Sequence, residues 1–174
     1  MKEVNSTWFG LIIAYLLPGL AGFFSASFFN PQLKRVLKAF MTADANVGLF
    51  LLVILSALTA GLLVTVFRWI LFERLLLKNH RLPEQGFAKL SDSNKLNAFR
   101  AAVDEHYRYH QFWGGMAIVI PVGFVGWAVE MWAITRSDHF CFILIGTLAL
   151  EIAAGFAASD AFKNYVKRGT AILT

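Results

Sequence analysis

Residues 47–67 read VGLFLLVILSALTAGLLVTVF, an apolar stretch that contains no charged side chain. A helix needs about 20 consecutive apolar residues to cross the ~30 Å hydrocarbon core of a bilayer. Soluble core helices are rarely apolar on every side, because one face meets water. This stretch therefore predicts a transmembrane helix, which we extend over residues 47–70.

The composition of the whole chain agrees with this prediction. Of its 174 residues, 57% are hydrophobic and only 16% are charged, whereas a soluble domain carries about a quarter charged residues. The net charge of +5 suits anionic lipid headgroups and the positive-inside bias better than nucleic acid. We expect the lipid bilayer to be the first partner and no direct nucleic-acid binding. The single cysteine, Cys141, excludes an intrachain disulfide.

Three further apolar runs are long enough to span, at residues 8–29, 113–134 and 140–160. Pro18-Gly19 predicts a kink in the first run. A cleaved signal peptide is the alternative for that run, but we expect a retained helix. Few residues join the last two runs, so these must form an antiparallel hairpin. The sequence predicts an all-α, polytopic membrane protein: one membrane domain over residues 1–174, built as a bundle of four transmembrane helices.

The polar segment 78–112 joins the second and third spans. Leu96, Phe99, Val103 and Tyr107 recur at helical spacing within it, which predicts an amphipathic cytoplasmic helix. No Pro or Gly lies between Ser93 and Trp113, so we expect this helix to continue or hinge into the third span. Phe99, Val103 and Tyr107 should then be buried.

The basic residues predict the orientation. With four spans, twelve of the 16 Lys and Arg residues lie on the side that carries both termini and the segment 78–112. Cytoplasmic loops carry the excess of Lys and Arg. We therefore expect a multi-pass protein of the bacterial inner membrane, with both termini in the cytoplasm.

Glu151 is the most informative single residue. It lies about eleven residues into the fourth run, or about 16 Å along a helix, near the middle of the bilayer, where an ionisable group is costly. Three interpretations stay open: a hydrogen bond to a hydroxyl of the second helix (Ser56, Thr59 or Thr65), a water-filled path, or a contact between copies in an oligomer. Every fourth residue on its face is small or mildly polar, which favours close helix contact in a homo-oligomer. The candidate pore or interface residues are therefore Glu151, Thr147, Gly155 and Ser159, and the row Ala57, Gly61 and Thr65 of the second helix could match them.

Two other charged pairs are predicted near the ends of the spans. Arg68 and Asp160 both fall at the cytoplasmic interface, where we expect an ordinary ion pair between them, with two separately hydrated charges as the alternative. Glu130 lies near the outer end of the third run, and Arg136 or His139 could neutralise it.

The segment 104–110, DEHYRYH, is the densest polar cluster. His106 and His110 would share a helix face, but two ligands are too few for a metal site. Arg100 and His106 match the Arg-x5-His spacing of some RNA-cleaving enzymes, a spacing that chance often produces. With no phosphate-binding glycine loop and no activated nucleophile, we expect neither enzyme activity nor a cofactor nor a metal. We assign Arg100, His106, Arg108 and His110 to a cytoplasmic surface for a protein partner.

Residues 14–19, AYLLPG, and residues 105–114, EHYRYHQFWG, resemble small uncharacterised bacterial four-span inner-membrane proteins. Some of these are encoded in antiphage-defence loci, as membrane accessories to a cytosolic nuclease or nucleotide-sensing partner. The resemblance implies a homo-oligomeric accessory or effector that anchors a cytosolic partner or permeabilises the membrane. The alternative is a small solute or ion channel or transporter that uses Glu151 in its path.

Overall fold

The computed structural model describes residue 10 and residues 12–42, 46–134 and 140–174 of the chain. The described residues form helices and no strand, which confirms the predicted all-α class. In chain order the helices are η1 (Ile12–Leu16), α2 (Leu17–Ser27), α3 (Pro31–Met41), α4 (Val47–Arg68), η2 (Trp69–Leu76), η3 (Glu84–Ser91), α5 (Ser93–Ala102), η4 (Val103–Tyr107), α6 (Arg108–Ile134) and α7 (Phe140–Leu173).

Three continuous helices are long and apolar enough to cross a membrane: Val47–Leu76, Ser93–Met131 and Phe140–Leu173. Each is longer than a bilayer requires, because it continues past its apolar run into charged sequence. The apolar helix Ile12–Ser27 is shorter than these three. The predicted first span, residues 8–29, begins in residues outside the described part.

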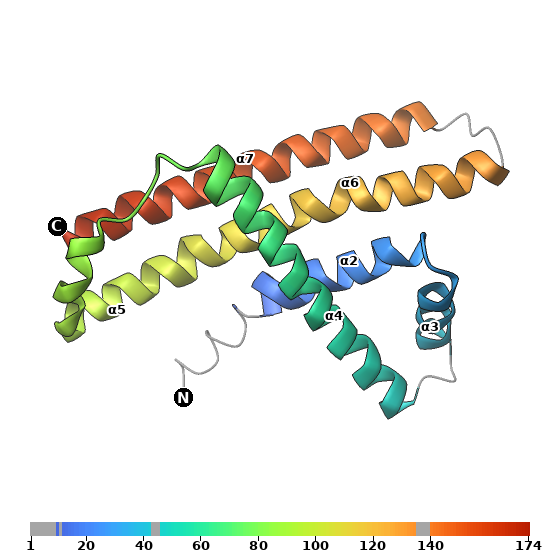
Figure 1. The fold of residues 1–174 in the computed structure, drawn as a ribbon, viewed down its shortest axis with the longest axis horizontal. Coiled ribbons are helices and arrows are strands. Elements are labelled where there is room, and N and C mark those ends of the chain that lie inside the picture. Colours follow the sequence, from blue (N-terminus) through green and yellow to red (C-terminus); the bar gives the residue numbers. More distant parts are fainter. Residues whose placement is uncertain (1–9, 11, 43–45, 135–139) are drawn as a thin grey trace.

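The main helices alternate in direction (Figure 1). η1 and α2 run in the same direction as α6, as two contacts in the same chain order show. The side-chain amide of Gln111 donates to the Tyr15 hydroxyl at 3.1 Å, and further along both helices the Ser25 hydroxyl lies 3.5 Å from the Val119 carbonyl. α7 lies beside α6 in the opposite direction, which confirms the predicted hairpin. α4 crosses α2 and α6 at an angle.

Glycines set how closely α2 and α4 approach. A Cβ atom at Gly19 would lie 1.9 Å from the Ala57 carbonyl oxygen, and one at Gly61 would lie 2.2 Å from the Tyr15 carbonyl oxygen. Only residues without a Cβ permit such contact between helix backbones. The row Ala57 and Gly61 therefore packs against the first apolar helix, and its predicted match with the Glu151 face of the fourth helix is wrong.

A short helix that the sequence analysis did not assign, α3, follows α2. The Asn30 side chain caps its N-terminus by accepting from the backbone amide of Gln32 at 2.9 Å, as an Asn at that position favours. α3 buries none of its residues, and Lys34 forms an ion pair with Glu130 of α6. The expected partners of Glu130, Arg136 and His139, lie outside the described residues.

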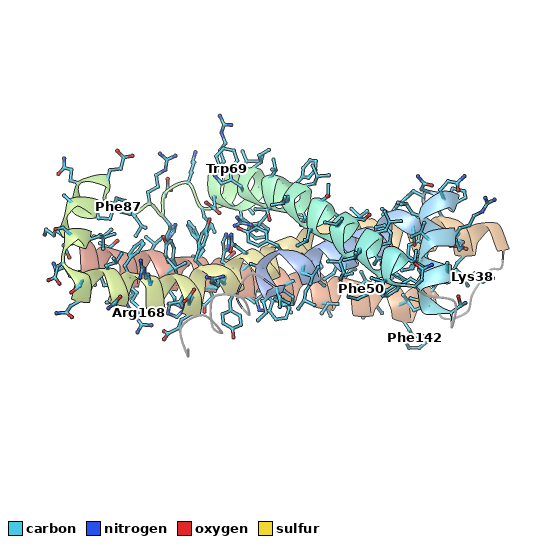
Figure 2. All side chains as sticks on the ribbon, turned by 90° about the horizontal axis from the view of Figure 1, so that it is seen from below. Lys38, Phe50, Trp69, Phe87, Phe142 and Arg168 are labelled. Carbon is cyan, nitrogen blue, oxygen red and sulfur yellow. The ribbon has the colours of Figure 1, made fainter. Side chains whose placement is uncertain are left out.

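The two ends of the bundle differ in character. We call residues 69–112 and 158–174 the polar end, and residues 28–42, 46–50, 124–134 and 140–146 the hairpin end. Figure 2 shows Phe87 and Arg168 at the polar end, with Lys38 and Phe142 at the opposite end.

At the polar end, α5, η4 and α6 form the single helix Ser93–Met131, so the expected continuity is present. α7 extends to Leu173, well past the predicted span 140–160, and packs there against α5, η3 and η4. The Phe99 ring contacts Phe87 and Tyr165. Phe99, Val103 and Tyr107 are half-buried, so they are covered less completely than predicted.

Candidate functional site

A buried arginine marks the point where α4 passes into η2. Arg68 is 1% exposed, although it follows the apolar run of α4 directly. Its side chain has room because a glycine faces it: a Cβ atom at Gly114 would lie 2.9 Å from the Arg68 Cδ. A buried guanidinium requires a carboxylate partner and further hydrogen bonds to offset the loss of hydration.

Glu73 supplies that carboxylate. An Arg68 terminal nitrogen lies 2.6 Å from Glu73 Oε1, and the Tyr107 hydroxyl donates to the same oxygen at 3.2 Å. Arg68 and Glu73 are five residues apart, a spacing that places side chains on different faces of an α-helix. The i→i+5 hydrogen bonding of the π-helix η2 brings them to one face instead. The Arg68 guanidinium also lies 5.8 Å from the centre of the Tyr107 ring, within cation–π range.

His110 joins this group from α6. It is completely buried, and its Nδ1 lies 2.8 Å from the Ala158 carbonyl oxygen of α7. A carbonyl only accepts, so Nδ1 carries the proton in this contact. Nε2 then faces Glu73 Oε1 at 3.6 Å, which is longer than a hydrogen bond. We call Arg68, Glu73, Tyr107 and His110 the polar cluster.

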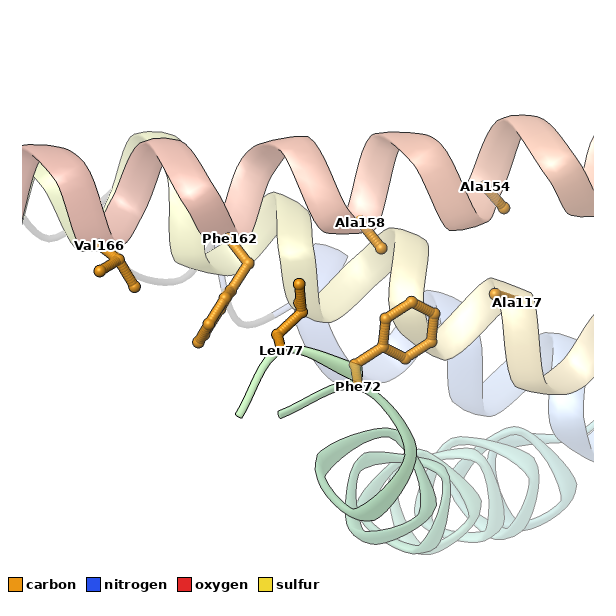
Figure 3. Close-up of a cluster of buried hydrophobic side chains, with 7 residues drawn as sticks. All are labelled: Phe72, Leu77, Ala117, Ala154, Ala158, Phe162 and Val166. Carbon is orange, nitrogen blue, oxygen red and sulfur yellow. The ribbon is translucent and has the colours of Figure 1, made fainter. Parts of the chain in front are cut away.

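Buried apolar side chains pack beside the polar cluster. Figure 3 shows seven of them, from η2 and the residue that follows it, from α6 and from α7: Phe72, Leu77, Ala117, Ala154, Ala158, Phe162 and Val166. The Phe162 ring centre lies 4.8 Å from that of His110. Within the described part of the chain, Arg68 Nε and His110 Nε2 are buried without a hydrogen-bond partner. The Tyr107 hydroxyl thus links η4 to Glu73 of η2, and the His110 ring links α6 to α7.

An open pocket of about 620 Å³ lies beside the polar cluster. Its wall is formed by η2, the segment that follows η2, η4 and the C-terminal half of α7. The lining residues are Trp69, Glu73, Arg74, His80, Arg81, Leu82, Tyr107, Phe162, Tyr165 and Val166. Basic groups and aromatic rings therefore meet in one pocket of the size that small ligands occupy.

The structure corrects two of the predicted assignments at this end. Arg68 pairs with Glu73 and not with Asp160, whose carboxylate instead accepts from the Asn164 side chain at 3.0 Å. His110 is completely buried, so it is not part of an exposed partner surface. Its ring is needed between α6 and α7, where water is excluded.

The other three candidates for that surface are accessible to different degrees. Arg100 is exposed, and His106 is half-buried with its Nε2 3.4 Å from a terminal nitrogen of Arg168. Arg108 is half-buried and pairs with Asp104 at 2.5 Å, one turn earlier in the same helix. They lie along the α5–α6 helix rather than in one compact site.

Glu151 lies on α7 away from the second helix. Its Oε2 is buried and has no hydrogen-bond partner among the described residues. The hydroxyls of Thr59 and Thr65 donate to the Leu55 and Gly61 carbonyls of their own helix. Among the described residues no hydrogen bond joins Glu151 to Ser56, Thr59 or Thr65, so that interpretation is not met within one chain.

The other residues of the Glu151 face do not close around it. The Thr147 hydroxyl donates to the Ile143 carbonyl of α7 at 2.8 Å, and Ser159 is half-buried. A Cβ atom at Gly155 would meet nothing within 4 Å. This face of α7 has free space within one chain.

The polar cluster is the feature that sequence reasoning missed. The one signal in the sequence is the charged pair Arg68 and Glu73 beside aromatic residues, but a regular α-helix would place the two on different faces. Among the described residues, no group of three His, Cys, Asp or Glu side chains is placed to hold a metal ion.

Comparisons with known proteins add no relative. The chain matches no protein-family model, and neither the curated proteins nor the solved structures contain a significant match. The function is therefore inferred from the geometry of the chain and from its sequence.

Proposed function

We propose that this chain is a four-span protein of the bacterial inner membrane, with both termini and the polar end in the cytoplasm. The parallel course of the first apolar helix and α6 supports a first span. Tyr15 contacts Gln111 near the start of α6, and Phe28 lies beside Gly126 further along the same helix. The basic residues concentrated on one side support the orientation. Reporter fusions after Thr42 and after Thr174 test it, and a periplasmic C-terminus would contradict it.

In this proposal the polar end anchors a cytosolic protein partner, and the chain has no catalytic role. The observation that carries it is the length of the packed helices. α7 has 34 residues, or about 51 Å at the helical rise, against the ~30 Å of the hydrocarbon core. A simple connection between two spans would not need this extension. The extension presents exposed charges from α5 and α7, among them Arg100, Lys163 and Lys167.

The resemblance to membrane proteins of antiphage-defence loci extends this proposal. The partner would then be a cytosolic nuclease or nucleotide-sensing protein, and the chain would recruit it to the membrane.

Site-specific photocrosslinking tests the anchor. A photoreactive residue at Arg100 or Lys163 should give an adduct of defined mass with one cytosolic protein in the native host. The matched position Ile152, exposed on the apolar half of α7, should give none. The double variant Lys163→Glu/Lys167→Glu should abolish the Arg100 adduct by reversing the local charge. The same adducts from Ile152 and Arg100, or none from either, would contradict an anchoring surface.

We also propose that copies of the chain associate through the Glu151 face of α7. Support comes from the unpartnered Oε2 of Glu151, together with the open space at Gly155. An unpaired carboxylate in a membrane is relieved when copies share protons or enclose water. Native mass spectrometry in nanodiscs should show an oligomer. A monomer whose Glu151→Gln variant behaves as the wild type would contradict this.

A membrane pore is the second candidate function, favoured by the same unpartnered carboxylate. An oligomer that permeabilises the membrane, or a solute or ion channel, would place Glu151 in its path. Vesicles loaded with a small dye distinguish this from anchoring. A pore predicts release by the wild type that Glu151→Gln changes, whereas an anchor predicts no release by either protein.

A further inference from the structure

The pocket at the polar end lies at the depth of lipid headgroups if α4 spans the bilayer. α4 has 22 residues, or about 33 Å, which matches the hydrocarbon core and places Arg68 at its edge. Trp69 follows at once, and Trp is enriched at this interface. Arg74 is a further turn along and Arg81 lies in the segment after η2. Both line the pocket.

The charge of the pocket is positive. Arg74 and Arg81 are exposed, and the ion pairs of the described residues include neither. Arg74 lies over the Trp69 ring at 5.8 Å, which holds its guanidinium beside the opening. Glu73 is the only carboxylate in the lining, and it is already paired with Arg68. The pocket therefore offers two guanidinium groups, and the imidazole of His80, to an incoming anion.

The lining also has an apolar part. Leu82, Phe162 and Val166 contribute aliphatic and aromatic surface to the same pocket as the arginines. A bare inorganic anion would use only the basic part of this pocket. A phospholipid would use both parts, with its phosphate on the arginines and its glycerol and upper acyl carbons on the apolar side. Basic pockets between helices at the cytoplasmic face bind anionic headgroups in this way.

We propose that this pocket binds the phosphate of an anionic phospholipid, with Arg74 and Arg81 as its two guanidinium ligands. Arginine suits the task because its planar fork donates two hydrogen bonds to phosphate oxygens. The inference rests on the membrane placement proposed above but not on the cytosolic partner. A soluble phosphate ester would present the same phosphate group to the arginines, so the experiment must distinguish it from a phospholipid.

Native mass spectrometry of the purified, delipidated full chain tests the proposal. The probes are phosphatidylglycerol, zwitterionic phosphatidylcholine and soluble glycerol 3-phosphate. We expect one phosphatidylglycerol per chain, and at least about tenfold weaker binding in Arg74→Gln/Arg81→Gln, because the charge-assisted hydrogen bonds from both guanidinium groups to the phosphate are lost. Arg74→Lys/Arg81→Lys should restore part of the affinity, which shows that the loss is not misfolding.

The control pair is Arg35→Gln/Lys38→Gln, which removes two exposed charges of α3 at the hairpin end. It should bind lipid as the wild type does. The site is overturned if both double variants lose the same lipid affinity or if neither loses any. It is also overturned if the wild type binds phosphatidylcholine and phosphatidylglycerol equally. Displacement of the lipid by equimolar glycerol 3-phosphate would overturn the lipid as occupant. Titration in detergent needs neither a partner nor a membrane orientation, so it succeeds or fails independently of the anchoring proposal.

Discussion

The two halves of α7 belong to one helix but meet different surroundings. Phe156, in the apolar half, is 73% exposed, whereas Phe162, less than two turns later, is 6% exposed. The apolar half turns small residues, Ala154 and Ala158, toward α6. The second half packs against η3, α5 and η4 and closes over the polar cluster.

The two halves of α7 differ in burial because the first half is suited to lipid and the second half to water. Lipid tails are as apolar as leucine, so an apolar side chain in a membrane gains little by exchanging lipid for protein. Helix contact there depends on small residues that let backbones approach. If the polar end lies outside the bilayer, as proposed, water replaces lipid there and aromatic rings must be covered by protein. Phe162 is accordingly packed against the His110 ring, whereas Phe156 stays exposed.

Two Phe→Ala substitutions, one in each half of α7, should give the largest difference in the free energy of unfolding. Phe162→Ala removes a ring packed against His110 and should lower the free energy of unfolding by about 3–5 kcal/mol. Phe156→Ala, the matched change, should alter it by less than about 0.5 kcal/mol. Detergent titration of the purified chain measures both. Equal losses would break the comparison by showing that another molecule covers Phe156.

The ion pairs at the two ends give the next contrast. Arg68→Met leaves the largely buried Glu73 carboxylate without its cation and should destabilise the fold by about 2–4 kcal/mol. Lys34→Met breaks the exposed pair with Glu130 at the hairpin end, which should change stability by less than about 1 kcal/mol. The double variant Arg68→Met/Glu73→Gln should recover at least half of the first loss. If it recovers nothing, the Arg68 stem and not its charge is what matters.

Glycine substitutions give the smallest contrast. A Cβ atom at Gly86 would lie 2.8 Å from the Leu173 carbonyl oxygen, so Gly86→Ala should shift the end of α7 and destabilise it by about 1–3 kcal/mol. Gly155 has open space, and Gly155→Ala should raise helix stability by up to about 1 kcal/mol. Melting temperature and native mass measure the outcome. A fall in oligomer fraction for Gly155→Ala alone would place Gly155 at a contact between copies.

Hydropathy and helical period are local properties, and they predicted the local features. The apolar runs predicted the three membrane-length helices. The short connection between residues 134 and 140 predicted the α6–α7 hairpin, and the absence of Pro and Gly between Ser93 and Trp113 predicted that the helix from Ser93 continues or hinges into the third span. The sequence analysis missed α3, although Leu33, Val36, Leu37 and Phe40 recur at helical spacing after the capping residue Asn30, because this helix is much shorter than a membrane span.

The partners of the polar groups were decided only by the tertiary structure. Arg68 pairs with Glu73 because η2 widens to a π-helix, a change of about one residue per turn that hydropathy does not encode. His110 is buried because the rotation of α6 points it at the Ala158 carbonyl of α7. Ala57 and Gly61 meet α2 rather than α7 for the same reason. The apolar runs of this sequence determined where the three membrane-length helices form. The rotation of each helix about its axis depends on all of its neighbours at once, and that rotation determines which charges meet.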